Sequence, residues 1–308
     1  MTDPRERIGA PRDVPPPRPV QDAPRPGPDR SGDGPAWLSE DTGLGRAART
    51  VADAVTRLLG GGADEAPAPG QPDTRRSAAG VLRDVITALG AAAAGAARRP
   101  EPPEGSGPDD EESARGPVGV LGELLTAAAP RLPVRDAARL RAAYPGKSDE
   151  EIADALVTRS ARLTAAVGAA TGGLSAAHWF VPGSLVALPL ELGAETLLTA
   201  GIEVVLLGEL HELAGRPAGG TPAERAAAYL SSWTQQRAVE TGAREGLGVV
   251  LGTAGFRALR RRLSRRMARG LGSAAPLFVG AALGGRGNLK ATETLARRVR
   301  ADLRRGPA

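Results

Sequence analysis

The sequence predicts an all-α protein, a Gly- and Ala-rich helical bundle preceded by a long disordered N-terminal region. Three observations favour this fold class. From residue 117 onward, apolar residues recur with the three-to-four-residue period of a helix. Two capping boxes, one from Ser148 to Glu151 and one from Thr221 to Glu224, mark helix starts. No stretch shows the sustained alternation of apolar and polar residues that is typical of a strand.

The first 35 residues are dominated by Pro, Arg, Asp and Gly. Such a segment cannot bury enough apolar surface to offset the entropy that ordering costs, so we expect it to be disordered. Three short apolar patterns with helical spacing follow, at 44–59, 81–89 and 120–125, and acidic Pro- and Gly-rich linkers separate them. A helix this short is marginal in water by itself. Each is therefore either a docking segment for a protein partner or only transiently helical.

These patterns predict a boundary near residue 116. Residues 1–116 are expected to form a tail with two short amphipathic helices, and residues 117–305 to form the helical domain. Removal of the tail is expected to leave the thermal unfolding of the domain nearly unchanged, because short helices between Pro/Gly linkers share little core with it.

Within the domain, residues 133–144 read as a helix that ends at Pro145 and Gly146. The Ser148 box opens a long helix, and the Thr221 box opens another with Pro222 at its first position. Gly146, Lys147 and Ser148 match the end of a phosphate-binding loop, but Arg141 stands where that motif needs its first Gly and no strand precedes it. Ser148 is therefore interpreted as a helix cap.

Residues 163–190 contain no Asp, Glu, Lys or Arg and are interrupted by two Gly residues at 172–173 and by a Pro-Gly pair at 182–183. We expect two buried helical pieces joined by a turn, followed by a long apolar helix over 189–213. Its Leu, Ile and Val residues favour membrane insertion by about 4.5 kcal/mol, but Glu195 and Glu203 would offset that gain. The helix is therefore not expected to insert by itself, and the alternatives are a buried core hairpin or an embedded segment with partners.

Three glutamates, Glu191, Glu195 and Glu203, interrupt this apolar helix together with Thr199. At 100° per residue they drift across 120° of one side of the helix and form a polar stripe that is expected to be buried. We expect the carboxylates to pair with arginine or to lie at a helix edge. Glu191 and Glu195, one turn apart, would otherwise be able to share a proton or a cation, so a metal-dependent enzyme that uses the glutamates of 191–203, with His178, is the alternative hypothesis.

The expectation nevertheless is a protein without catalytic activity, metal or other cofactor. The chain has no Cys and only two His, and no pair of ligands has the spacing of a common zinc or di-iron site.

Positive charge is concentrated at the C-terminal end. Residues 234–308 hold 16 basic and 4 acidic side chains, a net charge of +12, whereas residues 1–116 carry −4 and residues 117–233 carry −3. Within this part, residues 257–269 form a basic amphipathic helix whose apolar stripe contains Leu259, Leu263 and Met267. Its arginines are expected to bind an anionic membrane surface or another acidic partner: Arg257, Arg260, Arg261, Arg262, Arg265, Arg266 and Arg269. Nucleic acid is not expected, because no aromatic residue is interleaved to stack on bases.

Three pairs of glycines are spaced four residues apart in uncharged helical segments. Glycines at this spacing allow two helix backbones to approach closely, so we expect close helix packing at these positions. The pairs are Gly168 with Gly172, Gly248 with Gly252, and Gly280 with Gly284.

Three further motifs stand out: ALPLE at 187–191 with the following apolar helix up to Gly215, TPAER at 221–225, and PLFVGAALG at 276–284 with Asn288 and TET at 292–294. In these motifs the sequence resembles the EcsC family. The resemblance covers residues 117–305. It implies a cytoplasmic or membrane-associated protein, since the founding members are encoded beside an ABC transporter, and it carries over no catalytic residue.

Together these observations predict a non-catalytic accessory or scaffold protein. It is expected to be cytoplasmic and peripheral to, or partly embedded in, the inner face of the cell membrane. The expected partner is an anionic membrane surface or a membrane protein, and the absence of an apolar N-terminal segment leads us to expect no secretory signal.

Overall fold

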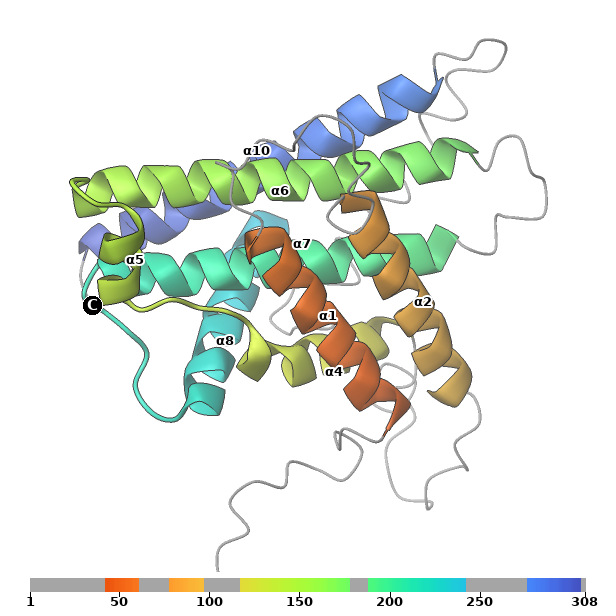
Figure 1. The fold of residues 1–308 in the computed structure, drawn as a ribbon, viewed down its shortest axis with the longest axis horizontal. Helices are drawn as coiled ribbons and strands as arrows, with labels where there is room; N and C mark the ends of the chain where they lie inside the picture. Colours follow the sequence, from red (N-terminus) through yellow and green to blue (C-terminus); the bar gives the residue numbers. More distant parts are fainter. Residues whose placement is uncertain (1–41, 61–77, 97–116, 178–187, 242–275, 306–308) are drawn as a thin grey trace, which may run out of the picture. The chain divides into compact units, whose positions relative to one another are not determined.

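The computed structural model describes residues 42–60, 78–96, 117–177, 188–241 and 276–305 (Figure 1). Within these ranges the chain forms eight α-helices and one 3₁₀ turn and contains no strand, so the predicted all-α fold is confirmed. The elements are α1 (Gly43–Gly60), α2 (Ala78–Ala96), α4 (Pro117–Ala128), η2 (Ala129–Arg131), α5 (Ala137–Ala143), α6 (Asp149–Ala177), α7 (Leu188–Leu213), α8 (Pro222–Thr241) and α10 (Pro276–Arg305).

The chain divides into two compact units, Met1–Ala36 and Trp37–Ala308, and all described residues belong to the second unit. Residues 1–35, which the sequence predicts to be disordered, lie outside the described residues.

Helix α7 lies at the centre of the packing. It contacts α1, α2, α4, α5, α6, α8 and α10, and nearly all of its residues are buried on every side. A helix that is buried all round has no solvent face to present, so it becomes the core around which other helices pack. The predicted helix over 189–213 is confirmed, beginning one residue earlier.

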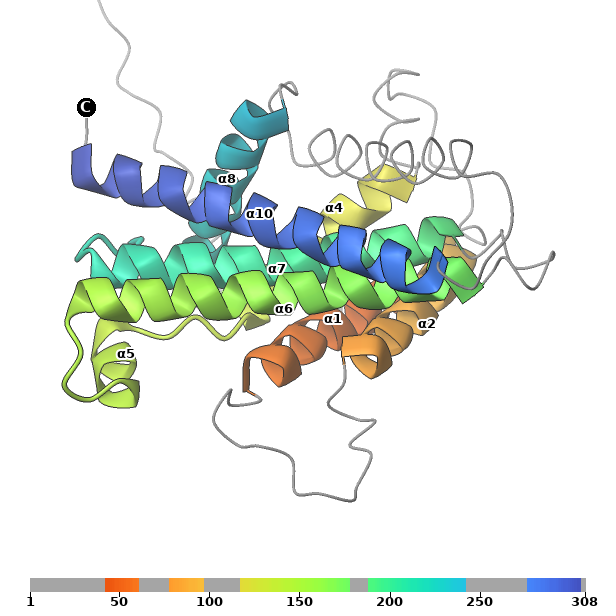
Figure 2. The same cartoon turned by 90° about the horizontal axis from the view of Figure 1, so that it is seen from above.

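Helices α6 and α10 form the most extensive helix–helix contact. They run antiparallel, because Gly168 of α6 lies against Gly284 while Thr164, one turn earlier, lies against Thr292. Figures 1 and 2 show α6, α7 and α10 running alongside one another, with α1, α2 and α8 crossing them. The glycine pair at 172–173 does not interrupt α6, and the predicted turn at 182–183 lies outside the described residues.

Both predicted capping boxes are confirmed. Ser148 N donates to Glu151 Oε2 at 2.8 Å, and Glu151 N donates to Ser148 Oγ at 3.3 Å. Thr221 N donates to Glu224 Oε2 at 2.6 Å, and Glu224 N donates to Thr221 Oγ1 at 3.3 Å. These bonds satisfy backbone N–H groups that have no partner within the first turn of a helix. Ser148 thus caps α6, as the sequence predicts.

Helix α5 is shorter than the predicted helix over 133–144. It starts after Asp136, whose side chain accepts a hydrogen bond from Arg139 N at 2.8 Å. It ends before Tyr144, and Gly146 in the following turn has φ +78°. Asp136 is therefore the N-cap, a role for which Asp is preferred and which the apolar pattern alone did not indicate.

Helices α1 and α2 pack on a glycine face of α7, which consists of Gly193 and Gly201. A Cβ atom at Gly201 would lie 2.7 Å from Val55 Cγ2 of α1, and one at Gly193 would lie 3.5 Å from Leu89 Cδ1 of α2. The apolar residues of both helices belong to the same hydrophobic core as those of α7. The packing therefore does not divide at residue 116, in contrast to the boundary expected from the sequence.

One helix of the described residues is long and apolar enough to cross a membrane by length and composition. It is Ala78–Gly95 of α2, of which 28% is buried. A core helix of a soluble protein meets the same criterion, so this observation is weak by itself.

Candidate functional site

The candidate site of the interior is a set of polar side chains where α7 faces α6, α8 and α10, and we call it the polar seam. It consists of Thr164, Glu195, Glu203, Trp233, Arg237, Asn288 and Thr292. The three predicted stripe residues Glu191, Glu195 and Glu203 are all buried, with exposed fractions of 3%, 9% and 0%. The sequence thus identified the α7 side of the seam, whereas its partners come from three other helices.

Glu203 is the best-satisfied member of the polar seam. Its Oε2 accepts from Trp233 Nε1 at 2.9 Å and from Arg237 Nε at 3.0 Å. Its Oε1 accepts from Thr292 Oγ1 at 2.8 Å and from Arg237 Nη2. Because indole and guanidinium groups can only donate, the oxygens of Glu203 are their acceptors. A buried carboxylate with four donors is suited to holding helices together, and its oxygens are already occupied.

A chain of hydroxyl groups links Glu203 to α6. Thr292 Oγ1 lies 2.9 Å from Thr164 Oγ1, and both side chains are fully buried. Since Thr292 donates its one hydrogen to Glu203, the single hydrogen of Thr164 is shared between Thr292 Oγ1 and the backbone oxygen of Ala161, which lies 3.1 Å from Thr164 Oγ1. The chain connects α6, α10 and α7 through side chains that reach one another only because α6 and α10 lie close together.

Glu195 occupies the next position along the seam. Its Oε1 accepts from Asn288 Nδ2 at 3.0 Å, and the same amide group donates to the backbone carbonyl of Thr164 at 3.2 Å. An amide nitrogen has two hydrogens, so both bonds can form at once. Asn288 therefore joins α10 to both α6 and α7. The hydroxyl of Thr199, between Glu195 and Glu203 on α7, is buried with no hydrogen-bond partner within the described residues.

Close backbone contact brings the seam together. A Cβ atom at Gly168 would lie 2.8 Å from Gly284 O, and one at Gly285 would lie 2.9 Å from Ala165 O, so neither position has room for a side chain. Of the predicted packing glycines, the structure brings Gly168 and Gly284 together across α6 and α10.

For the other predicted packing glycines, no close contact with a second helix is described. Gly172 is buried on α6, and Gly280 lies within α10. Gly248 and Gly252 lie outside the described residues.

A second buried ion pair was not predicted. Arg135 Nε donates to Glu209 Oε1 at 2.6 Å and Arg135 Nη2 donates to Glu209 Oε2 at 3.2 Å, and Glu209 is 3% exposed. Burial alone would lower the pKa of Arg135, but the hydrogen bonds and charge of Glu209 outweigh burial and raise the pKa above its ordinary value. Burial and the charge of Arg135 lower the pKa of the neighbouring Arg159. Glu209 lies on the same apolar helix as the predicted stripe, which was the available signal, but no pattern indicates which of many arginines it meets.

The carboxylates of α7 are separated rather than clustered. Glu195 contacts an amide, Glu203 a guanidinium and Glu209 a different guanidinium. No group of three or more His, Asp or Glu side chains that could hold a metal ion occurs within the described ranges. His178, which the alternative hypothesis includes, lies outside them.

A row of exposed basic side chains follows the outer side of α10, and we call it the basic stripe. It consists of Arg286, Lys290, Arg297 and Arg304, all exposed. At 100° per residue the four lie within about 40° of one another and extend about 27 Å along the helix. Arg297 Nη2 donates to Thr294 Oγ1 at 2.8 Å, and none of the four forms an ion pair within the described part of the chain. The density of arginine in the sequence points to residues 257–269 and does not distinguish this stripe.

The seven arginines predicted to meet an anionic partner, Arg257, Arg260, Arg261, Arg262, Arg265, Arg266 and Arg269, lie outside the described residues. Comparisons with family models, with characterised proteins and with solved structures find no match to this chain. The resemblance to the EcsC family therefore stays a prediction.

Proposed function

We propose that the protein is a non-catalytic accessory or scaffold protein that binds the anionic inner face of the cell membrane. The resemblance to the EcsC family implies a cytoplasmic or membrane-associated protein, and the proposal agrees with it. The observation that carries this proposal is the basic stripe. Its four cations lack carboxylate partners within the described residues and face outward along one side of a helix, so their charges are available to an anionic surface. The basic segment 257–269 lies shortly before α10 in the sequence and would add to the same attraction.

The polar seam supports a structural rather than a catalytic role for the α7 carboxylates. A catalytic carboxylate must be free to exchange a proton or to bind a substrate or metal. The oxygens of Glu203 instead accept four hydrogen bonds from Trp233, Arg237 and Thr292. These bonds use the carboxylate to join α7 to α8 and α10.

The strength of the stripe is sufficient for reversible binding. Each Lys or Arg close to an anionic bilayer contributes about 1 kcal/mol, and Glu293 lies on the same side of α10 between Lys290 and Arg297, so the net contribution is about 3 kcal/mol, or about two orders of magnitude in affinity. The contacts are exposed and are therefore screened by salt over about 10 Å at 0.1 M. Binding that is weak, salt-sensitive and dependent on acidic lipids is the expected behaviour.

Cosedimentation with vesicles tests the proposal. The full-length protein should bind phosphatidylglycerol vesicles at low salt and bind phosphatidylcholine vesicles poorly. The variant R286E/K290E/R297E/R304E should bind acidic vesicles by orders of magnitude less. Its matched control is R46E/R83E/R139E/R225E, which reverses four exposed arginines on α1, α2, α5 and α8 and has the same net charge.

A third variant, R261E/R262E/R265E, measures the contribution of the segment 257–269. If the wild-type protein ignores acidic vesicles at low salt, or if the stripe variant and its control bind equally, the stripe is a solvated helix face and the membrane proposal fails. Metal analysis addresses the enzymatic alternative, because a stoichiometric metal that is lost in E195Q would replace this proposal with a metal-dependent enzyme.

A further inference from the structure

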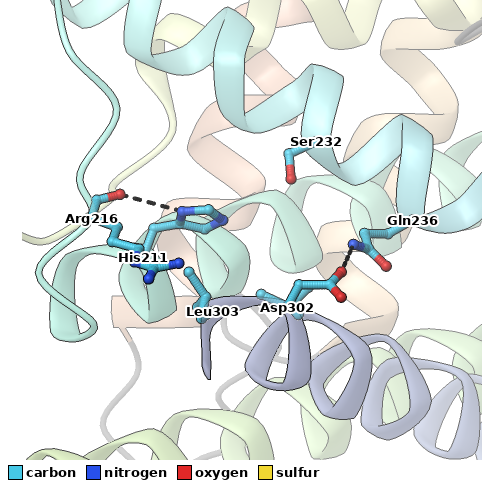
Figure 3. Close-up of a pocket in the computed structure, with 7 residues that line it drawn as sticks. His211, Arg216, Ser232, Gln236, Asp302 and Leu303 are labelled. Carbon is cyan, nitrogen blue, oxygen red and sulfur yellow. Dashed lines mark hydrogen bonds between the residues drawn. The ribbon is translucent and has the colours of Figure 1, made fainter. Parts of the chain in front are cut away.

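A cleft of about 210 Å³ lies where the C-terminal end of α7, the second half of α8 and the last turns of α10 meet (Figure 3). It is separate from the polar seam and from the basic stripe. Its polar groups are His211, Arg216, Ser232, Gln236 and Asp302, and Leu303 contributes to its apolar part.

The backbone at the end of α7 fixes the position of His211. Gly215 has φ +67°, a conformation that favours glycine, and its N–H donates to Glu212 O at 3.1 Å. Arg216 N then donates to His211 O at 2.9 Å, which completes a Schellman motif. The carbonyl of Arg216 lies 3.3 Å from His211 Nδ1, so the residue that closes the helix also holds the imidazole ring.

This contact determines which imidazole nitrogen carries the hydrogen. A carbonyl oxygen can only accept, so Nδ1 is the donor. Burial, together with the charge of Arg216, lowers the pKa of His211, and the ring is therefore neutral at neutral pH with a free lone pair on Nε2. Figure 3 shows this second nitrogen directed toward the side of the cleft that Ser232 and Asp302 form.

Opposite charges occupy opposite sides of the cleft. The guanidinium of Arg216 lies beside His211, and Asp302 and Gln236 lie across from them (Figure 3). Asp302 is held in place, because Oδ2 accepts from Gln236 Nε2 and Oδ1 accepts from Arg305 Nη2 at 2.8 Å. Arg216 forms no ion pair within the described residues. The cleft thus offers one cation, a carboxylate that also pairs with Arg305, a neutral nitrogen acceptor and the hydroxyl of Ser232.

We propose that this cleft binds a small amino acid as a zwitterion. The carboxylate of the ligand pairs with Arg216 and accepts from the Ser232 hydroxyl, as guanidinium and carboxylate groups do in charge-assisted pairs. The ammonium group donates to the two acceptors that the cleft supplies on this side, His211 Nε2 and the Asp302 carboxylate. The size agrees with this class of ligand, because a cavity of about 150 Å³ holds benzene and the cleft therefore holds about eight non-hydrogen atoms.

Nuclear magnetic resonance of the two histidines tests the assignment directly. The chain contains only His178 and His211, so a ¹⁵N-histidine-labelled H178Q variant reports on His211 alone. Titration with L-threonine should move the Nε2 resonance in a saturable manner. Isobutyrate, which offers only the anion, and isopropylamine, which offers only the cation, should each need concentrations at least about tenfold higher, since each lacks one charge-assisted interaction.

Two substitutions complete the test. In the same labelled protein, R216Q should weaken threonine binding by about tenfold or more, while R225Q, a charge-matched change at an exposed position of α8 outside the cleft, should leave it unchanged. Arg216 is partly exposed at the end of a helix, so the folded state should persist, and the dispersion of the amide spectrum checks this. The proposal is wrong if threonine leaves the His211 resonance unmoved, if the single-charge analogues bind equally well, or if R216Q and R225Q behave alike.

Discussion

At the scale of single residues, charged side chains of the interior are paired with one another. Glu203 has no exposed surface, and its pairing partner Arg237 has a side chain that is 12% exposed. Two charges removed from water are costly, and their attraction and hydrogen bonds only offset that cost. The pair therefore adds little net stability compared with apolar residues, but the loss of one member leaves the other buried and uncompensated.

The variant E203Q tests this reasoning. It keeps the size of the side chain but removes the charge, so it should lower the free energy of unfolding by about 3–5 kcal/mol. The double variant E203Q/R237M should be more stable than the sum of the two single changes predicts, because neither charge remains. Urea denaturation of the four proteins measures this coupling.

An exposed pair provides the comparison. Arg57 and Asp84 join α1 to α2 at 3.1 Å, with side chains that are 43% and 50% exposed. The variant D84N should change the free energy of unfolding by no more than about 1 kcal/mol. If E203Q and D84N have similar effects, burial does not control the contribution of these pairs.

The capping boxes make stability depend on pH. Backbone N–H donation from Ser148 and Thr221, with help from their hydroxyls, lowers the pKa of Glu151 and Glu224 below the ordinary value of 4.5. A lowered pKa in the folded state means that each ionised carboxylate stabilises the fold above pH 4.5. This stabilisation is lost as the pH falls from that value through the folded-state pKa.

The double variant E151Q/E224Q should therefore melt at a lower temperature than the wild type at about pH 7, and the difference should shrink at about pH 3. Thermal unfolding followed by circular dichroism at both pH values measures the difference. A gap that stays constant between the two pH values would show that the ionised carboxylates are not responsible.

At the scale of secondary-structure elements, α7 has two opposed faces. The glycine face receives Val55 of α1 and Leu89 of α2, and the opposite side carries Glu195 and Glu203 toward α8 and α10. On the glycine face, the absence of side chains lets the neighbouring helices come close to α7. On the opposite side, hydrogen bonds join α7 to its neighbours. Substitutions on the two sides are therefore expected to destabilise the fold for different reasons, by a steric clash on the glycine face and by the loss of hydrogen bonds on the opposite side.

Two glycines of α10 distinguish close packing from helix propensity. A Cβ atom at Gly284 would collide with the backbone carbonyl of Gly168, whereas one at Gly287 would meet nothing within 4 Å. The variant G284A should lower the free energy of unfolding by about 1–3 kcal/mol because α6 and α10 must separate. The variant G287A should instead raise it by about 0.5–1 kcal/mol, since Ala favours a helix over Gly.

Chemical denaturation of both variants measures these opposite signs. G284A and G287A are the same chemical change, three residues apart on one helix, so a difference between them reports only on their surroundings. If both are stabilising, the backbones of α6 and α10 are not in the close contact described here.

The sequence predicted the elements well where the signal is local. Both capping boxes lie within four consecutive residues, and the limits of α7 follow from a continuous apolar pattern. It failed where the signal depends on partners. The wheel of α7 was interpreted for its carboxylates, and its glycines were overlooked because a glycine face becomes visible only when a neighbour such as Val55 fills it. Arg135 could not be matched to Glu209 because the chain is rich in Arg throughout.

At the scale of the whole molecule, α1 and α2 belong to the described core. The expectation of a separable tail considered each helix alone in water, where its length makes it unstable. In the structure, Val51 and Val55 of α1 and Val81 and Leu82 of α2 have no exposed surface. Tertiary packing overrides the weakness of the isolated helix, so the stability of the domain depends on residues before 117.

Truncated proteins test whether the domain begins at residue 117 or includes α1 and α2. Deletion of residues 1–36, which form the separate first unit, should leave the melting temperature nearly unchanged. Deletion of residues 1–116 should lower it sharply or prevent folding, because it uncovers the glycine face of α7. Thermal unfolding of both truncated proteins decides the matter. Equal melting temperatures would restore the sequence-based boundary at 116.

The contact between α6 and α10 also has a consequence for the order in which the protein can fold. Asn288 meets the carbonyl of Thr164 across 124 residues, and Arg300 meets Asp154 across 146. Pairings this distant require the closure of long loops and form late. Glu203 meets Trp233 across only 30 residues, so α7 and α8 can associate while synthesis continues. The newly made chain must therefore wait, with one side of α6 uncovered, until the 30 residues of α10 have left the ribosome.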